Sequence, residues 1–300
     1  MSRRRIHPAG AAAGALPPDL VGQVLQRLGL PAAPEPDLDG LRRLYGAWCR
    51  RVPFDNVRKL IHLYAGDRGP LPGDDAVDFF RAWLRHGTGG TCWAGNGALQ
   101  TLLRTLRFDA RRGLGTMLVA PNLPPNHGTV IVALEGHRYL VDASILHAEP
   151  LPLEERAATR IVHGAWGVRC ERRARHWFVH WRALHAPQGI DCRIEKLRTS
   201  ARDFQQRHER SRPWSPFNFS LYARALRGDA VTGIAFGRRI EFDATGQVRE
   251  SIATAAERTA FLVERLGMDP ALLARLPPDR PLPPPPAAAT GPGQRVHPTD

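Results

Sequence analysis

Cys92 lies where a glycine-rich turn, Gly89-Gly90-Thr91, leads into an apolar helix, and no other feature constrains this 300-residue chain as strongly. Beyond it, leucines recur with the i, i+3, i+4, i+7 spacing of a helix that is buried on one face. These leucines are Leu99, Leu102, Leu103 and Leu106. We therefore expect Cys92 in the first turn of the helix, where the helix dipole and the free amides favour a thiolate. Taken alone, the position also fits a buried structural cysteine, which is what most free cysteines are.

A predicted β-hairpin brings a histidine and an aspartate together. Residues 127–134 are apolar and β-branched, residues 137–142 form a second strand-like run, and the two residues between them end in glycine, which indicates a hairpin. With a two-residue turn, His127 and Asp142 become diagonal neighbours on one face, within reach of a hydrogen bond. A slip of one residue would place them on opposite faces. The alternative is a surface histidine and a turn-capping aspartate with no shared role.

Cys92, His127 and Asp142 follow one another in chain order. They supply a nucleophile, a base and a carboxylate that orients the base, and thiol-based acyl transfer requires these three side chains. We therefore take them as the candidate catalytic residues.

Around these residues the chain resembles the arylamine N-acetyltransferases. Residues 52–57 read Val-Pro-Phe-Asp-Asn-Val, which is similar to the family's Ile-Pro-Phe-Glu-Asn-Leu, and residues 89–96 match its Gly-Gly-x-Cys-x-x-x-Asn. Further segments that occur in the family's order are residues 139–142, 150–151 and 215–219. The likeness spans residues 20–276, which is nearly all of the chain that we expect to fold.

The resemblance implies an α+β fold, with an N-terminal helical bundle that carries the nucleophilic cysteine, a central antiparallel β-barrel and a C-terminal α/β lid. The residue patterns run in the same order, from helical signals to strand-like segments to a mixed region. The predicted divisions are a disordered tail (1–18), a helical domain with Cys92 (19–110), a β-barrel domain with His127 and Asp142 (111–200), an α/β lid (201–276) and a Pro-rich disordered tail (277–300).

By the same resemblance the chain would be a ping-pong acyltransferase. Cys92 would take an acetyl group from acetyl-CoA as a thioester and pass it to a small-molecule amine, either an arylamine or an N-hydroxyarylamine. His127 would act as the base and Asp142 would orient it, while backbone amides near Cys92 would hold the oxyanion. The sequence assigns no residues to CoA binding.

Several positions depart from the family pattern. Thr88 stands where the family has an arginine, and Asp55 replaces the glutamate with which that arginine pairs, so we expect this ion pair to be missing. Ala94 replaces a glutamate or glutamine. After Asp142 the family continues Val-Gly-Phe-Gly, whereas residues 143–146 read Ala-Ser-Ile-Leu. The loss of both glycines should stiffen a loop that lies beside the acyl pocket in the family, which leaves the donor and the acceptor open.

Three alternatives remain. A transglutaminase-like thiol hydrolase has the same Cys, His and Asp in the same chain order, but it uses no CoA. An amide synthase of secondary metabolism would take its acyl group from a carrier-bound donor, which the altered loop after Asp142 would suit. A non-catalytic scaffold is motivated by Thr88 and Ala94, and it would leave Cys92 with ordinary thiol reactivity.

The chain is strongly basic, with a formal net charge of +13 from 42 basic and 29 acidic residues, and it has only two lysines. A basic face could contact the phosphates of CoA or the acidic surface of an acyl carrier protein, or it could simply be a solvated arginine-rich surface. We expect no nucleic-acid partner, because no nucleic-acid motif and no interleaved aromatic residues accompany the charge. The densest basic patch is Arg169, Arg172, Arg173 and Arg175.

The sequence predicts neither a metal site nor a membrane protein. Cys49, Cys170 and Cys192 are widely spaced, and no Cys-x-x-Cys or His-Glu-x-x-His occurs. The N-terminal Ser-Arg-Arg-Arg lacks the apolar region of a signal peptide, and no apolar run is long enough for a membrane span. We therefore expect a cytoplasmic protein with reduced thiols.

Overall fold

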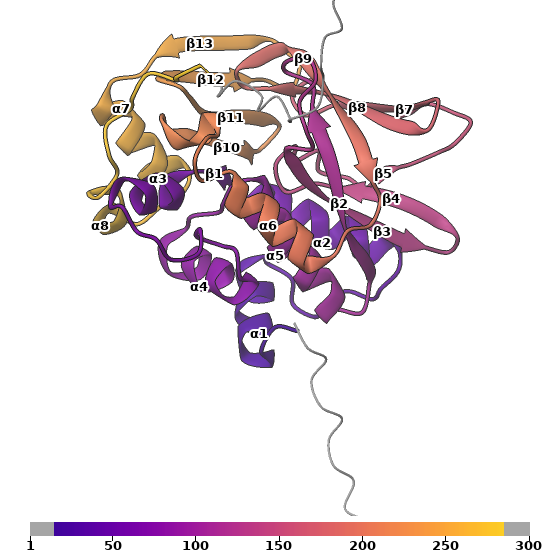
Figure 1. The fold of residues 1–300 in the computed structure, drawn as a ribbon. Coiled ribbons are helices and arrows are strands. Elements are labelled where there is room, and N and C mark those ends of the chain that lie inside the picture. Colours follow the sequence, from indigo (N-terminus) through magenta and orange to yellow (C-terminus); the bar gives the residue numbers. More distant parts are fainter. Residues whose placement is uncertain (1–14, 285–300) are drawn as a thin grey trace, which may run out of the picture.

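The computed structural model describes residues 15–284, which combine helices with two antiparallel sheets (Figure 1). The first part of the chain is helical. Its helices are α1 (Pro18–Arg27), α2 (Leu38–Arg51), α3 (Val57–Tyr64), α4 (Ala76–His86) and α5 (Cys92–Thr105). Local chemistry sets their ends, since α4 begins where the Asp75 carboxylate accepts a hydrogen bond from the Val77 amide at 2.8 Å and ends at Gly87, whose φ is 71°. Helix α5 is buried along most of its length within the main hydrophobic core.

The larger sheet has eight strands and is drawn on the right of Figure 1. They are β2 (Asp109–Met117), β3 (His127–Leu134), β4 (His137–Val141), β5 (Leu151–Pro152), β6 (Thr159–Ile161), β7 (Val168–Arg173), β8 (His176–Ala183) and β9 (Ala186–Lys196). Their order is β5-β4-β3-β2-β9-β8-β7-β6, and all neighbours are antiparallel. The two outermost strands, β5 and β6, lie next to each other. The Thr159 hydroxyl of β6 donates to the Pro152 carbonyl of β5 at 2.6 Å. The sheet is therefore a nearly closed barrel.

The smaller sheet joins distant parts of the chain. Strand β1 (Phe54–Asp55) comes from the helical region and pairs with β10, with Phe54 opposite Arg224. The other elements of this region are α6 (Ala201–Arg210), β10 (Tyr222–Arg227), β11 (Ala230–Ala235), β12 (Arg238–Phe242), β13 (Val248–Ile252), α7 (Ala255–Ala260) and α8 (Pro270–Leu273). Strand β1 also forms a parallel bridge with Gly90, two residues before Cys92. The small sheet is thus attached directly to the start of α5.

The predicted α+β class, with helices first, then an antiparallel barrel and then a mixed region, is confirmed. Parts of both predicted tails belong to the described residues. The buried Leu16 donates its amide to the Thr105 hydroxyl at 3.2 Å, and the Arg280 amide donates to the Phe219 carbonyl at 2.8 Å. The remaining tail residues, 1–14 and 285–300, lie outside the described part of the chain. The domain boundaries stay predictions.

No helix in the described part of the chain combines the length and the apolar character that crossing a membrane requires.

Candidate active site

Cys92 is the first residue of α5, as the sequence predicts, and it is 7% exposed. The preceding turn passes very close to other backbone, since a Cβ on Gly89 would lie 1.8 Å from the Pro53 carbonyl oxygen. Only glycine allows this approach. The first amides of a helix have no partner within the helix, so the sulfur lies next to free hydrogen-bond donors.

The hairpin register is confirmed. Leu134 lies opposite His137 and Val130 opposite Val141, as a two-residue turn requires. This register brings His127, the first residue of β3, to Asp142, the residue that follows β4, with 2.7 Å between His127 Nε2 and Asp142 Oδ2. Both residues are buried.

Asp142 is held from several directions. Its Oδ1 accepts hydrogen bonds from the amides of Ser144 at 2.8 Å and Ile145 at 3.1 Å, and its backbone carbonyl accepts one from the Tyr45 hydroxyl at 2.9 Å. Burial alone would raise the pKa of Asp142, but the charge and hydrogen bond of His127 and the two amides lower that pKa to about 2. The carboxylate therefore stays ionised at neutral pH.

His127 links this carboxylate to the thiol. Burial alone would lower the pKa of His127, but the charge and hydrogen bond of Asp142, together with a hydrogen bond to Cys92, raise that pKa to about 10. Because Nε2 contacts Asp142, Nδ1 is the ring nitrogen left for the sulfur. The structure thus brings together all three predicted site residues, with the imidazole between the sulfur and the carboxylate.

Asn96 connects α5 to the same loop. Its Nδ2 donates to the Gly128 carbonyl at 2.7 Å, and its Oδ1 accepts from the Ala143 amide at 2.9 Å. The sequence singled out Asn96 only as part of the cysteine motif. Its position four residues after Cys92, one turn along the same helix face, is the signal that it serves the same site.

Arg224 is a supporting residue that the sequence did not indicate. It is 1% exposed, and its Nη1 donates to the Ser144 carbonyl at 3.0 Å and also to the Ile145 carbonyl. Its guanidinium lies 5.1 Å from the ring centroid of Trp181. Arg224 therefore fixes the loop after Asp142 from β10, a contact between distant segments that no local pattern reveals.

The loop after Asp142 contains a residue with a left-handed backbone conformation, although it lacks the glycines of the family pattern. Leu146, which stands where the family pattern has its second glycine, has φ 53° and is fully buried. A left-handed conformation costs about 1–2 kcal/mol for a residue with a Cβ. The loop thus has a strained backbone that is held by its surroundings, among them Arg224.

On the other side of Cys92, the family ion pair is missing, as expected. None of the ion pairs formed within residues 15–284 involves Asp55, which instead accepts hydrogen bonds from the Gly89 amide at 2.6 Å and the Val57 amide at 3.0 Å. Burial raises the pKa of Asp55 to about 6, even though both amides lower it. Thr88, which replaces the arginine, is also fully buried. Asp55 therefore ties β1 to the turn before Cys92 through two amides and not through an ion pair.

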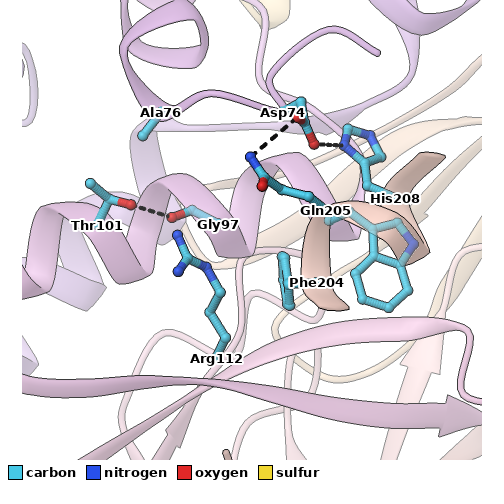
Figure 2. A pocket seen from close by; sticks show the side chains of 9 residues that line it. Asp74, Ala76, Gly97, Thr101, Arg112, Phe204, Gln205 and His208 are labelled. Carbon is cyan, nitrogen blue, oxygen red and sulfur yellow. Dashed lines mark hydrogen bonds and ion pairs between the residues drawn. The ribbon is translucent and has the colours of Figure 1, made fainter. Parts of the chain in front are cut away.

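Helix α6 packs over α5, and residues of both helices line a cavity of about 20 Å³ (Figure 2). The Phe204 ring of α6 meets Trp93 edge-on, with 5.0 Å between centroids. Gln205 Nε2 donates to Asp74 Oδ2 at 3.4 Å, and His208 Nδ1 lies 3.3 Å from Asp74 Oδ1, which ties α6 to the loop before α4. The other lining residues are Ala76, Gly97, Thr101 and Arg112. The space suits about one water molecule.

The densest basic patch is largely paired with acidic side chains. Arg173 contacts Glu171 at 2.6 Å, Arg172 contacts Glu155 at 3.2 Å, and Arg169 also pairs with Glu171. Two of these arginines share Glu171, and Arg175 takes part in none of the ion pairs formed within residues 15–284, so the patch keeps a net positive charge. Within residues 15–284, no three His, Cys, Asp or Glu side chains lie together as metal ligands would.

Comparison with known proteins gives one consistent result. A family model described as N-acetyltransferase matches residues 37–269. The arylamine N-acetyltransferase of Mycolicibacterium smegmatis is 32% identical over 129 residues, which are 41% of this chain and 45% of the relative. The arylamine N-acetyltransferase / N-hydroxyarylamine O-acetyltransferase of Salmonella typhimurium is 25% identical over 163 residues, which are 52% and 55% of the two chains. The matched part is thus about half the length of these relatives.

Solved structures show the same fold. The structure of Mycobacterium marinum arylamine N-acetyltransferase in complex with CoA matches with a TM-score of 0.72 at 21% identity, over 85% of this chain and 97% of that one.

Proposed function

Because the chain belongs to the N-acetyltransferase family, a family of enzymes, we propose that it transfers an acetyl group from acetyl-CoA to an arylamine or N-hydroxyarylamine. The observation that carries this proposal is the contact of 2.7 Å between His127 and Asp142, made beside Cys92 at the start of a helix. The M. marinum relative with CoA bound supports CoA as the carrier of the acetyl group.

In the first half-reaction, Cys92 would attack the thioester carbonyl of acetyl-CoA. Because the pKa of His127 is raised to about 10, the thiol proton already rests on His127 at neutral pH, so a thiolate faces an imidazolium. The new S–C bond forms as the carbonyl becomes a tetrahedral oxyanion. Backbone amides near Cys92 would hold this oxyanion. The bond to the CoA sulfur then breaks, and His127 returns its proton to that sulfur.

In the second half-reaction, the amine nitrogen would attack the acetyl-Cys92 thioester. His127 accepts a proton from the nitrogen and later passes it to the departing Cys92 sulfur, which restores the free enzyme. Asp142 stays ionised throughout and holds the imidazole in the orientation that faces the sulfur. Arg224 positions Asp142 through its loop, and Asn96 does so through the loop and by donating from Nδ2 to Asp142 Oδ1 at 3.4 Å.

The other hypotheses drawn from the sequence gain nothing from the comparisons. The relatives and the structure described above are all arylamine N-acetyltransferases, which does not favour a thiol hydrolase, an amide synthase or a scaffold. No observation supports an acyl carrier protein as partner. A small-molecule amine remains the proposed acceptor.

Two-substrate kinetics would test the ping-pong order. We expect parallel double-reciprocal lines when acetyl-CoA and an arylamine are varied together, and exchange of labelled CoA into acetyl-CoA with no amine present. Cys92→Ser should lose the exchange, whereas Cys170→Ala, which alters a buried cysteine of the barrel, should keep it. Intersecting lines without exchange would contradict the proposal.

A further inference from the structure

Tyr45 is a buried tyrosine of α2 whose hydroxyl binds the backbone of the loop after β4. The hydroxyl donates to the Asp142 carbonyl at 2.9 Å, and it accepts from the Asp142 amide at 3.1 Å and from the His147 amide at 3.3 Å. A phenol oxygen can donate once and can accept through its lone pairs, so one atom serves three backbone groups. Tyr45 is 0% exposed, which shields these contacts from water.

The three contacts join the two ends of one short loop. Asp142 directly follows β4, and His147 lies close to the start of β5. Between them the chain turns back on itself, since the Leu146 amide donates to the Asp142 carbonyl at 3.1 Å and Leu146 has φ 53°. This left-handed backbone is strained for a residue with a Cβ. The Tyr45 hydroxyl therefore holds together the two ends of a strained loop.

Neither of the two amides that Tyr45 accepts has another partner in the part of the chain that the structure describes. The amides of Ser144 and Ile145 are bound to the Asp142 carboxylate, and Arg224 binds the carbonyls in the middle of the loop. A buried amide that is left without a partner is costly. We therefore expect the ends of the loop to move when the hydroxyl is removed.

The carboxylate held in this way is the one that orients His127. Asp142 Oδ2 lies 2.7 Å from His127 Nε2, and because an aspartate side chain is short, a shift of the Asp142 backbone would change this contact. Burial raises the pKa of Tyr45 well above the usual 10, and the charges of Cys49 and Asp142 act in the same direction, so the hydroxyl keeps the proton that it donates. Helix α2 is itself fixed in the main hydrophobic core by Leu41, Leu44 and Trp48.

On the basis of the proposed function, we propose that Tyr45 is a positioning residue for acyl transfer, which holds Asp142 in line with His127 through the backbone of the loop. Its hydroxyl binds the loop and no reacting group, and it transfers no proton. Its contribution to the rate is therefore made through the pairing of Asp142 with His127. A residue that only stabilised the fold would have no such dependence on that pair.

The first experiment removes the hydroxyl alone. In Tyr45→Phe, we expect kcat for acetyl transfer to an arylamine to fall about tenfold. The pKa of His127, followed by NMR titration of its ring without any acetyl donor, should fall by about one unit, because the imidazolium is less well paired with Asp142. The matched control is Tyr139→Phe, since Tyr139 lies in β4 and its hydroxyl forms no hydrogen bond within residues 15–284. It should leave kcat and this pKa as in the wild type.

A double-mutant cycle separates positioning from a general effect on the fold. In the Asp142→Asn background, Tyr45→Phe should lower kcat by less than about twofold, because the pairing through which Tyr45 acts is already lost. The same substitution in the wild type should cost the full tenfold. This difference between the two backgrounds is the signature of a residue that acts through Asp142.

Each outcome decides the proposal. Wild-type kcat in Tyr45→Phe, an unchanged His127 pKa, or an equal loss of kcat in both backgrounds would overturn it. If Tyr45→Phe does not fold, hydrogen exchange in the wild type decides, because the Asp142 and His147 amides should exchange slowly, and rapid exchange would overturn the proposal. A wild type that transfers no acetyl group would instead reject the proposed function, while the titration of His127 still tests Tyr45.

Discussion

The two sides of Cys92 compensate their buried charges differently. On the barrel side, His127 and Asp142 are oppositely charged partners 2.7 Å apart. On the helical side, Asp55 and Lys59 are both buried, but neither forms an ion pair within residues 15–284. The charges of Arg58 and Glu209 only shift their pKa values. A paired charge keeps its protonation state over a wide pH range, whereas an unpaired one stays responsive to pH and to ligands.

This difference indicates that the two sides of Cys92 have different roles. The barrel side has the fixed geometry and fixed charges that proton transfer needs. The helical side holds buried groups whose protonation can respond to pH or to a bound ligand. The chain also departs from the family pattern on this side, at Thr88 and Asp55. Variants on each side should therefore behave differently, and four of them test this, from the largest expected effect to the smallest.

Asp142→Asn should remove the ion pair with His127 on the barrel side. The amide cannot stabilise the imidazolium and favours the wrong tautomer of His127, so we expect kcat to fall about 10³- to 10⁴-fold. The control is Asp269→Asn, because Asp269 lies 2.7 Å from His86 in a similar pair away from Cys92, and it should change kcat by less than about twofold. A loss of similar size in both variants would contradict a special role for Asp142.

The pH dependence of stability should distinguish the two sides. Asp55 has a pKa near 3.8 when unfolded and about 6 when folded, so the native state holds its proton more tightly. Stability should therefore fall as pH rises from 4 to 6, by about 3 kcal/mol for two pKa units. Urea unfolding of the wild type and Asp55→Asn over this range measures the difference, and a pH-independent difference would contradict the prediction.

On the paired side, the contributions of Asp142 and His127 to stability change with pH in opposite directions. The contribution of Asp142 is present above its unfolded pKa of 3.8 and should be lost as pH falls through about 2. The contribution of His127 is fully present below pH 6.5 and should be lost as pH rises through about 10. Asp142→Asn, examined by the same urea titrations, should remove the acid limb.

Arg224→Met should weaken the link between the small sheet and the loop after Asp142. It leaves the Ser144 and Ile145 carbonyls without their buried donor, so we expect a loss of about 2 kcal/mol in unfolding free energy and a lower kcat. Arg224→Lys, which keeps one donor, should lie between the wild type and Arg224→Met. Thermal unfolding and acetyl transfer measure both effects, and a Met variant with wild-type kcat would remove Arg224 from the positioning of Asp142.

Thr88→Val should be slightly stabilising. The Thr88 hydroxyl is buried with no hydrogen-bond partner among residues 15–284, so its removal should add about 1 kcal/mol and raise Tm by about 2 °C. Thr101→Val is the control, because the Thr101 hydroxyl donates to the Gly97 carbonyl at 2.9 Å and its loss should bring no gain. A lower Tm for Thr88→Val would show that this hydroxyl is satisfied.

The barrel side could be predicted from local sequence patterns. The start of α5 follows from glycines next to leucines at helical spacing, and the hairpin register follows from a two-residue turn in which Glu135 has φ 49° and Gly136 has φ 81°. Because side chains alternate along a strand, that register alone places His127 and Asp142 on one face. The three site residues could therefore be proposed together, although their catalytic roles stay predictions.

The helical side could not be predicted in the same way. The pairing of Phe54 with Arg224 joins segments that are distant in the sequence, and two residues are too few to show an alternating pattern. The burial of Lys59 depends on Ser211 from another part of the chain. The left-handed Leu146 contradicts local preference, since the surrounding structure imposes it.

Intact-mass spectrometry after mixing the pure protein with acetyl-CoA and no acceptor tests the central claim most directly. We predict a single acetyl adduct on the wild type and none on Cys92→Ala, with release of the adduct when an arylamine is added. An equal adduct on Cys92→Ala, or a wild type that stays unmodified although Cys92 reacts rapidly with an alkylating reagent, would contradict the thioester mechanism.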